Sequence, residues 1–146
     1  GLVANDAQQK LLRVNVTAWS FTDPHEQISF ANGLSTEDAV ICISHSGATK
    51  DVLESMHVAK GNGAKIISIV GNPRSKLAEC SDVYLLALSS ELPFRSGSVV
   101  SRLCQLAVVD VLTLGIATTR KAAILEQFGR NQQTVYQRSM DGRCGR

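Results

Sequence analysis

The sequence has no run of lysine or arginine, and its formal net charge is only +2. Binding to DNA or RNA needs a concentrated basic surface, so these residues carry no electrostatic footprint for nucleic acid. The first residues lack the basic start and long apolar stretch of a signal peptide. The apolar runs are all shorter than the roughly 20 residues that cross a bilayer, so we expect no membrane partner.

Closely spaced cysteine pairs are also missing. The four cysteines are Cys42, Cys80, Cys104 and Cys144, and no two of them have the spacing of a zinc site. Cys42 and Cys104 lie in apolar runs, which is typical of small core residues. We therefore expect no metal, no cofactor and a reduced, cytoplasmic protein.

Apolar residues make up 44% of the 146 residues, enough for one domain with a real core. Hydrophobic spacing and turn residues predict an alternation of helices and strands. Helices are expected at 1–14, 24–32, 51–60, 75–80, 96–119 and 120–140, and strands at 16–21, 39–44, 65–70 and 82–87. The strands are short, continuous apolar runs. The pattern predicts an α/β fold of the three-layer αβα type, with a parallel sheet of flavodoxin-like type and helices on both faces.

The same pattern predicts whether several side chains lie in the core or on the surface. Trp19 and Phe21 are expected in the core, and His25 and His57 on the surface of helices. The segment 96–119 is apolar over much of its circumference, so we expect it to be buried against the sheet or a partner chain.

The stretch from Ser44 to Thr49 carries the main functional signal. It joins the apolar run Ala39–Ile43 to the amphipathic run Asp51–Lys60, so a buried strand is expected to end there and a helix to begin. Helix starts leave backbone N–H groups unpaired and carry partial positive charge. Hydroxyls and N–H groups at such a helix start favour binding of a phosphate or another small anion, and Gly47 would let the backbone approach that anion closely. The candidate contacts are Ser44, Ser46, Gly47, Ala48 and Thr49.

A plain strand-to-helix turn, with Ser46 or Thr49 capping the helix, is the structural alternative. One cap needs one hydroxyl, whereas this loop has three. No lysine follows the glycine, and the spacing is not that of an ATP-type P-loop. A monophosphate therefore fits better than a nucleoside triphosphate.

The pattern Ser-x-Ser-Gly-x-Thr after an apolar strand resembles the signature of the sugar isomerase (SIS) domain. The segments Ile43–Leu53, Ala59–Lys65, Gly71–Ala78 and Glu91–Arg102 resemble, in order, the SIS domain of RpiR-type transcriptional regulators. The resemblance covers residues 1 to 120. It implies that Ser44, Ser46 and Thr49 contact the phosphate of a sugar-phosphate effector.

The resemblance also implies a homodimer or higher homo-oligomer, with DNA bound only by an upstream helix-turn-helix domain that these residues do not contain. SIS domains begin with a strand and a Gly-x-Gly-x-Ser turn, which are expected upstream of Gly1. The expected divisions are residues 1–120 as an SIS domain without its first strand, 121–140 as a C-terminal helix, and 141–146 as a disordered tail.

Four further residues are candidates for contact with the sugar, at an interface or at the mouth of the pocket. Glu91 is suited to accept hydrogen bonds from sugar hydroxyls, and Arg95 to lie near the phosphate or between subunits, with Arg102 a weaker candidate of the same kind. A solvated loop pair is the alternative for Glu91 and Arg95. His45 has the chemistry of a general base, but we expect it only to line the mouth of the pocket.

Two classes of function fit these residues. The first is a ligand-sensing domain of a transcriptional regulator, without catalytic residues. The alternative is an aldose-ketose isomerase of the SIS fold acting on sugar phosphates, which needs a placed general base, often glutamate. Pro93 and Phe94 occupy the stretch where the isomerase acid is expected, which favours the sensor.

Overall fold

A computed structural model describes residues 1–89 and 99–121. In these ranges the order is α1 (Leu2–Arg13), α2 (Pro24–Asn32), β1 (Ala39–Ser44), α3 (Lys50–Gly61), β2 (Lys65–Val70), α4 (Lys76–Cys80), β3 (Val83–Leu86) and α5 (Val99–Thr119). The strands form a parallel sheet in the order β1-β2-β3. The expected parallel α/β fold is confirmed, and the segment 122–140 lies outside the described residues.

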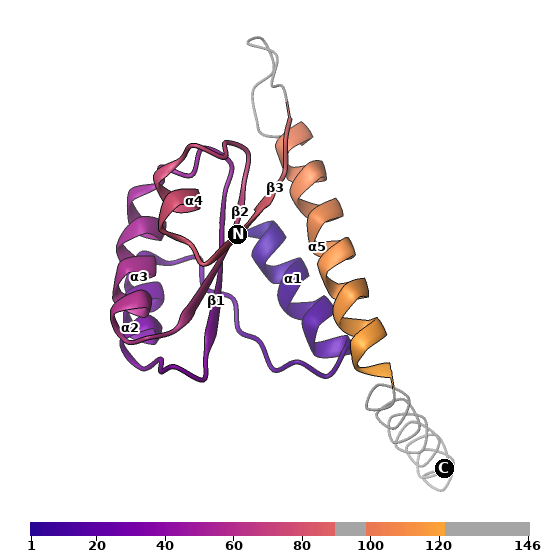
Figure 1. Cartoon of the computed structure of the whole chain (residues 1–146), viewed down its shortest axis with the longest axis horizontal. Coiled ribbons are helices and arrows are strands. Elements are labelled where there is room, and N and C mark those ends of the chain that lie inside the picture. Colours follow the sequence, from indigo (N-terminus) through magenta and orange to yellow (C-terminus); the bar gives the residue numbers. More distant parts are fainter. Residues whose placement is uncertain (90–98, 122–146) are drawn as a thin grey trace, which may run out of the picture.

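Helices cover both faces of this sheet, which gives the expected three layers (Figure 1). On one face Met56 of α3 and Leu77 of α4 pack with Ile66 of β2. On the other face Val3 of α1 and Val109 of α5 pack in a second core cluster. A strand buried on both faces must be apolar at successive positions, which is why β2 reads as a continuous apolar run.

The helix starts follow the capping residues in the sequence. The Asp23 carboxylate accepts hydrogen bonds from the backbone N–H groups of His25 and Glu26, and Pro24 takes the first helical position of α2. Ser75 caps α4 in the same way through its hydroxyl, which accepts from the N–H of Ala78. Such caps satisfy N–H groups that the helix itself leaves unpaired.

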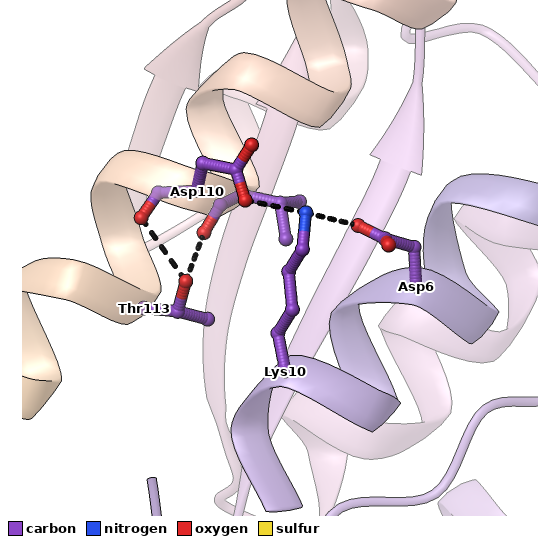
Figure 2. Close-up of polar contacts among 5 residues, drawn as sticks. Asp6, Lys10, Asp110 and Thr113 are labelled. Carbon is purple, nitrogen blue, oxygen red and sulfur yellow. Dashed lines mark hydrogen bonds and ion pairs between the residues drawn. The ribbon is translucent and has the colours of Figure 1, made fainter. Parts of the chain in front are cut away.

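Helices α1 and α5 are joined by an ion pair across their interface (Figure 2). The Lys10 ammonium lies 2.7 Å from a carboxylate oxygen of Asp6 on its own helix and also contacts the carboxylate of Asp110 on α5. The Asp110 carboxylate, followed by that of Asp6, raises the pKa of Lys10 above its usual value. Lys10 therefore adds a polar contact between α1 and α5 to the apolar contacts of the second core cluster.

The strand expected at 16–21 is not formed, and that prediction was wrong. The backbone N–H of Ser20 donates to Oε1 of Gln8, and the Ser20 hydroxyl donates to Oδ1 of Asn5. A β-prone sequence becomes a strand only where a neighbouring strand supplies hydrogen bonds. Within the described part of the chain no strand pairs with this segment, so side chains of α1 satisfy it instead.

The placement of Trp19 in the core was also wrong, since 70% of its surface is exposed. Phe21 is half-buried and stacks on Phe30, with ring centroids 3.8 Å apart. His25 and His57 are exposed as expected. Cys42 is buried as expected, whereas Cys104 is only half-buried at the edge of the second cluster.

Helix α5 departs from its expected burial. Five of its large apolar side chains are between 45% and 72% exposed: Val99, Val100, Leu103, Val111 and Leu114. Its 21 residues, with a mean hydropathy of 1.8 over the most apolar window, are also long and apolar enough to cross a membrane by length and composition alone. The sequence-based view that every apolar run is too short for this was therefore wrong for α5.

Candidate anion-binding site

The loop from Ser44 to Thr49 lies where the sequence pattern places it. Strand β1 ends at Ser44, and α3 begins at Lys50. Ser44 pairs with Val70 in the register of β1 and β2, so the loops that follow both strands meet at the same edge of the sheet. In open α/β sheets ligands bind at this edge, outside the carboxyl ends of the strands.

The loop hydroxyls form an ordered network. The hydroxyl oxygens of Ser44 and Thr49 lie 2.8 Å apart in a hydrogen bond, and the N–H of Gly47 donates to the Ser44 oxygen at 3.1 Å. The N–H of Ala48 donates to the hydroxyl of Ser46 at 3.3 Å. Ser44 is buried, while Ser46, Ala48 and Thr49 are exposed. The structure thus brings all five predicted contact residues into one turn, with three of them open to a ligand.

The start of α3 adds backbone donors to these hydroxyls. Thr49 is the N-cap residue, but its side chain makes no capping hydrogen bond because it is directed to Ser44. The first N–H groups of a helix have no acceptors within the helix, and the helix dipole makes this end positive. An anion above the loop would therefore meet backbone N–H groups as well as hydroxyls. Thr49 therefore does not form the plain capped turn that is the structural alternative.

Gly47 is required by both its conformation and its surroundings. Its φ is +61°, in the left-handed region that glycine adopts most readily. A β-carbon at this position would lie 2.1 Å from the Ser75 hydroxyl oxygen and 2.4 Å from its Cβ. The loop backbone therefore packs directly on the N-cap of α4.

The segment 71–77 holds the loop in place, a role that the sequence analysis missed. The N–H of Gly71 donates to the carbonyl of His45, and the N–H of Leu77 donates to the carbonyl of Gly47. A β-carbon at Gly71 would lie 2.4 Å from Nδ1 of His45. That nitrogen is buried and has no hydrogen-bond partner among the residues that the structure describes. The order of the elements could have revealed this support. The segment 71–77 follows β2, and β2 is the strand that pairs with β1.

A groove of about 820 Å³ runs along the outer edge of β1 and reaches the loop. Thr49 lines it, together with Arg102 and Gln105 of α5 and Trp19 of the segment between α1 and α2. Gln105 is only 8% exposed. The groove places Arg102 in the same cavity as the loop, whereas Glu91 and Arg95 lie outside the described residues.

Beneath the site, β1 contributes an inert thiol. Cys42 is 5% exposed, and burial raises the pKa of this thiol to about 12. It stays protonated at neutral pH, so it is neither an anion nor a nucleophile there.

The fold is a parallel α/β domain with a turn rich in hydroxyl groups at the carboxyl edge of its sheet. The family model of the SIS domain matches residues 1–115. The chain therefore belongs to the SIS domain family.

Two relatives and one solved structure illustrate the similarity. An uncharacterized HTH-type transcriptional regulator of Caldanaerobacter subterraneus is 33% identical over 141 residues, which are 97% of this chain and 50% of that protein. The HTH-type transcriptional regulator RpiR of Escherichia coli K12 is 31% identical over 131 residues, 90% of this chain and 43% of its own. The NanR protein of Vibrio vulnificus, complexed with ManNAc-6P, has the same fold: TM-score 0.81, 24% identity, 92% of this chain and 51% of that one. The chain thus spans about half the length of the curated relatives it matches.

Proposed function

We propose that this domain binds a phosphorylated sugar and is the effector-sensing part of a transcriptional regulator. DNA would be bound by a helix-turn-helix domain outside these residues, as the names of the regulators that it resembles imply. The observation that carries the proposal is the turn that precedes α3. Ser46 and Thr49 are exposed in it, and the Thr49 hydroxyl bonds to that of Ser44 and does not cap the helix.

The chemistry of the loop favours a phosphate monoester. Ser44, Gly47 and Ala48 order the turn through their own hydrogen bonds. The exposed hydroxyls of Ser46 and Thr49 and the first N–H groups of α3 are the donors that suit a tetrahedral anion, and α3 directs its positive end toward it. The NanR structure contains ManNAc-6P, a sugar phosphate, in the same fold. Glu91, Arg95 and His45 remain our candidates for contact with the sugar or at an interface.

A thermal-shift titration tests the binding proposal. ManNAc-6P and other hexose and pentose phosphates would be compared with the unphosphorylated sugars and inorganic phosphate. A phosphorylated sugar should raise the melting temperature, and Ser46→Ala should remove that shift. Ser29→Ala, at an exposed position on α2, is the matched control and should retain it. If no sugar phosphate shifts wild type, the proposal fails.

An assay on the same ligands distinguishes the sensor from the isomerase alternative. A sensor should leave a bound sugar phosphate chemically unchanged over hours, as followed by NMR. Turnover that is lost in Glu91→Gln would assign catalysis to Glu91 and overturn the sensor.

The domain divisions from the sequence remain part of the proposal: 1–120, 121–140 and 141–146. We infer that one more strand, from a segment preceding Gly1, occupies the groove beside β1. Among the described residues, the outer edge of β1, which lines the groove, has no partner strand. A longer polypeptide carrying that segment should show slower hydrogen exchange at the outward-facing amides of β1. Unchanged exchange there would contradict the added strand.

The assembly that we propose is a cytoplasmic homodimer without a membrane partner. A regulator that binds a symmetric operator needs two copies of its DNA-binding domain, and the effector domain is a natural place to join them.

A further inference from the structure

The turn between β1 and α3 has an inner and an outer layer of residues. Ser44 is 7% exposed and Gly47 is also buried, whereas Ser46 and Thr49 are exposed. A ligand that approaches from solvent meets the outer layer first. Ser44 therefore lies behind the residues that a ligand can reach, although the resemblance implied that its hydroxyl contacts the phosphate.

The Ser44 hydroxyl makes two hydrogen bonds among the described residues. The N–H of Gly47 donates to its oxygen at 3.1 Å and is shared with the Ser44 carbonyl oxygen at 3.2 Å. The hydroxyl of Thr49 lies 2.8 Å from the same side-chain oxygen. Because an N–H can only donate, the Gly47 contact uses an acceptor site of the Ser44 oxygen and leaves the Ser44 proton available for Thr49.

Burial decides which of the two hydroxyls is the donor. If Thr49 donated, the Ser44 proton would be buried without an acceptor among the described residues, and an unpaired buried donor costs free energy. If Ser44 donates, the Thr49 proton is the one left over. Thr49 is exposed, so that proton can be given to water or to a ligand. The hydrogen bond therefore runs from Ser44 to Thr49.

The hydroxyl of Ser46 has the same polarity. The N–H of Ala48 donates to its oxygen at 3.3 Å, so this oxygen already accepts one hydrogen bond from the turn. Ser46 is exposed, and its proton is directed to no acceptor within the described part of the chain. Both outer hydroxyls thus accept from the turn and offer a proton outward. Two such donors suit a group that only accepts, such as a deprotonated phosphate.

We propose that Ser44 is a positioning residue of the phosphate site and does not touch the ligand; this rests on the sugar-phosphate binding proposed above. Hydrogen bonds run from the Gly47 N–H to Ser44, from Ser44 to Thr49, and from Thr49 to the phosphate. Each bond polarises the next donor, so the chain strengthens its last bond. A lone hydroxyl rotates freely, whereas the proton from Ser44 restricts where the Thr49 proton can point. The site is thereby matched to a phosphate monoester without a proton on its terminal oxygens.

A double-mutant cycle tests whether Ser44 acts through Thr49. Isothermal titration with ManNAc-6P, and separately with inorganic phosphate, gives the Kd of wild type, Ser44→Ala, Thr49→Val and the double variant. Ser44→Ala should weaken binding by roughly threefold to tenfold, because Thr49 keeps its hydroxyl but loses the contact that orients it. In the Thr49→Val background the same substitution should change Kd by less than about twofold, since the residue through which it acts is gone.

Ser68→Ala is the matched control for the loss of a buried serine. Ser68 is fully buried in β2, and its hydroxyl has no hydrogen-bond partner among the described residues. This variant should bind both probes like wild type. Far-ultraviolet circular dichroism reports whether each variant is folded.

Proton NMR of wild type tests the direction of the relay without any substitution. The Ser44 hydroxyl proton should be protected from exchange with water and give a resolved signal, which Ser44→Ala assigns by its loss. The Thr49 hydroxyl proton should exchange rapidly in the free protein. Binding of ManNAc-6P should shift the amide signal of Gly47, although Gly47 is buried, and this shift should be lost in Thr49→Val. A merely structural role of Ser44 would not produce that dependence.

The outcomes separate the relay from the proposed function. Equal losses on Ser44→Ala in the two backgrounds would indicate direct contact, and a protected Thr49 proton in place of the Ser44 proton would reverse the direction. Either result would overturn the relay and leave the phosphate site intact, as would a folded Ser44→Ala that binds like wild type. Wild type that binds neither probe would overturn the phosphate site and the relay together. If Ser44→Ala does not fold, the hydroxyl and Gly47 signals of wild type and Thr49→Val decide.

Discussion

The hydroxyl oxygens of Ser44 and Thr49 lie 2.8 Å apart across the turn between β1 and α3. This contact links the last residue of β1 to the N-cap of α3. It explains why Thr49 does not cap α3 itself, although its position would allow it. The turn is ordered by its own side chains, and the helix start remains open to an external anion.

Thr49→Val should therefore weaken sugar-phosphate binding by roughly 10- to 100-fold. The substitution keeps the shape of the side chain but removes a hydrogen bond to a charged group, which contributes about 1.5–3 kcal/mol. Isothermal titration with the best ligand of the thermal screen measures the change. Thr49→Ser keeps the hydroxyl and should stay within a few-fold of wild type, and equal losses in the two variants would contradict a hydrogen-bonding role.

Gly47→Ala should lower the free energy of unfolding by about 2 kcal/mol or more. Left-handed backbone costs a residue with a side chain roughly 1 kcal/mol, and the new β-carbon would lie 2.1 Å from the Ser75 hydroxyl oxygen. Urea denaturation followed by circular dichroism gives the value. Gly115→Ala is the control, since a β-carbon there meets nothing within 4 Å, and should raise stability by about 0.5–1 kcal/mol.

The turn could be predicted from sequence because its signals are local. A continuous apolar run, a cluster of hydroxyls with one glycine and an amphipathic run fix a strand, a turn and a helix without reference to distant residues. The support from Gly71 and Leu77 could not be read in this way. It depends on β1 and β2 being neighbours, which is a property of the sheet and not of either segment.

The errors at Trp19 and α5 have the same physical origin. Apolar composition shows that a residue is suited to burial, but it does not identify the surface that covers it. The 16–21 segment lacks a partner strand within the described residues, so Trp19 stays exposed beside the groove. Helix α5 was expected to be buried against the sheet or a partner chain. Its spacing alone did not show that Gln105 and Thr113 would be buried beside Val109. Nor did it show that Val111 and Leu114 would stay exposed.

Asp82→Asn should make the protein less stable at neutral pH and remove part of its sensitivity to acid. The Asp82 carboxylate accepts a hydrogen bond of 2.7 Å from the N–H of Ile66, and this bond lowers the pKa of Asp82 below its usual value, with Lys65 contributing. A lowered pKa in the folded state adds stability above the unfolded pKa, and this is lost as pH falls through the folded value.

Urea midpoints from pH 7 to pH 2 measure this effect. The urea midpoint of wild type should exceed that of Asp82→Asn by a constant amount near neutral pH. This difference should shrink below about pH 4, where the carboxyl in the unfolded chain begins to take up a proton. Glu37→Gln, at an exposed loop position, serves as the control and should follow wild type. Parallel curves for wild type and Asp82→Asn across the whole range would contradict the assignment.

Cys42 should resist alkylation in the folded protein. Burial raises the pKa of its thiol to about 12, so the thiolate that reacts with iodoacetamide is scarce at pH 8. Cys80 and Cys104 are half-buried and should be labelled first. Mass spectrometry of peptides after brief labelling distinguishes the sites, and labelling in 8 M urea should remove the difference. Cys42 labelling as fast as Cys80 in the native protein would show that β1 opens readily.

Lys10→Met should weaken the packing of α1 on α5 by about 1 kcal/mol. The side chain of Lys10 is 25% exposed and its ammonium bridges Asp6 and Asp110, so the loss should exceed that of an isolated surface pair (Figure 2). Lys50→Met is the matched control, because the ammonium of Lys50 lies 3.7 Å from Glu54 and both side chains are largely exposed. That substitution should change stability by no more than about 0.5 kcal/mol.

The pH dependence of the stability difference tests whether the charge of Lys10 causes the loss in Lys10→Met. Because its pKa is raised in the folded state, the stabilisation is complete below about pH 10.5, where lysine in the unfolded chain begins to lose its proton, and disappears as pH rises through the folded pKa. The urea midpoints of wild type and Lys10→Met should therefore converge above about pH 10.5 and differ by a constant amount from pH 7 to pH 9. A difference that persists unchanged at pH 11.5 would assign the effect to packing of the lysine stem instead of the ion pair.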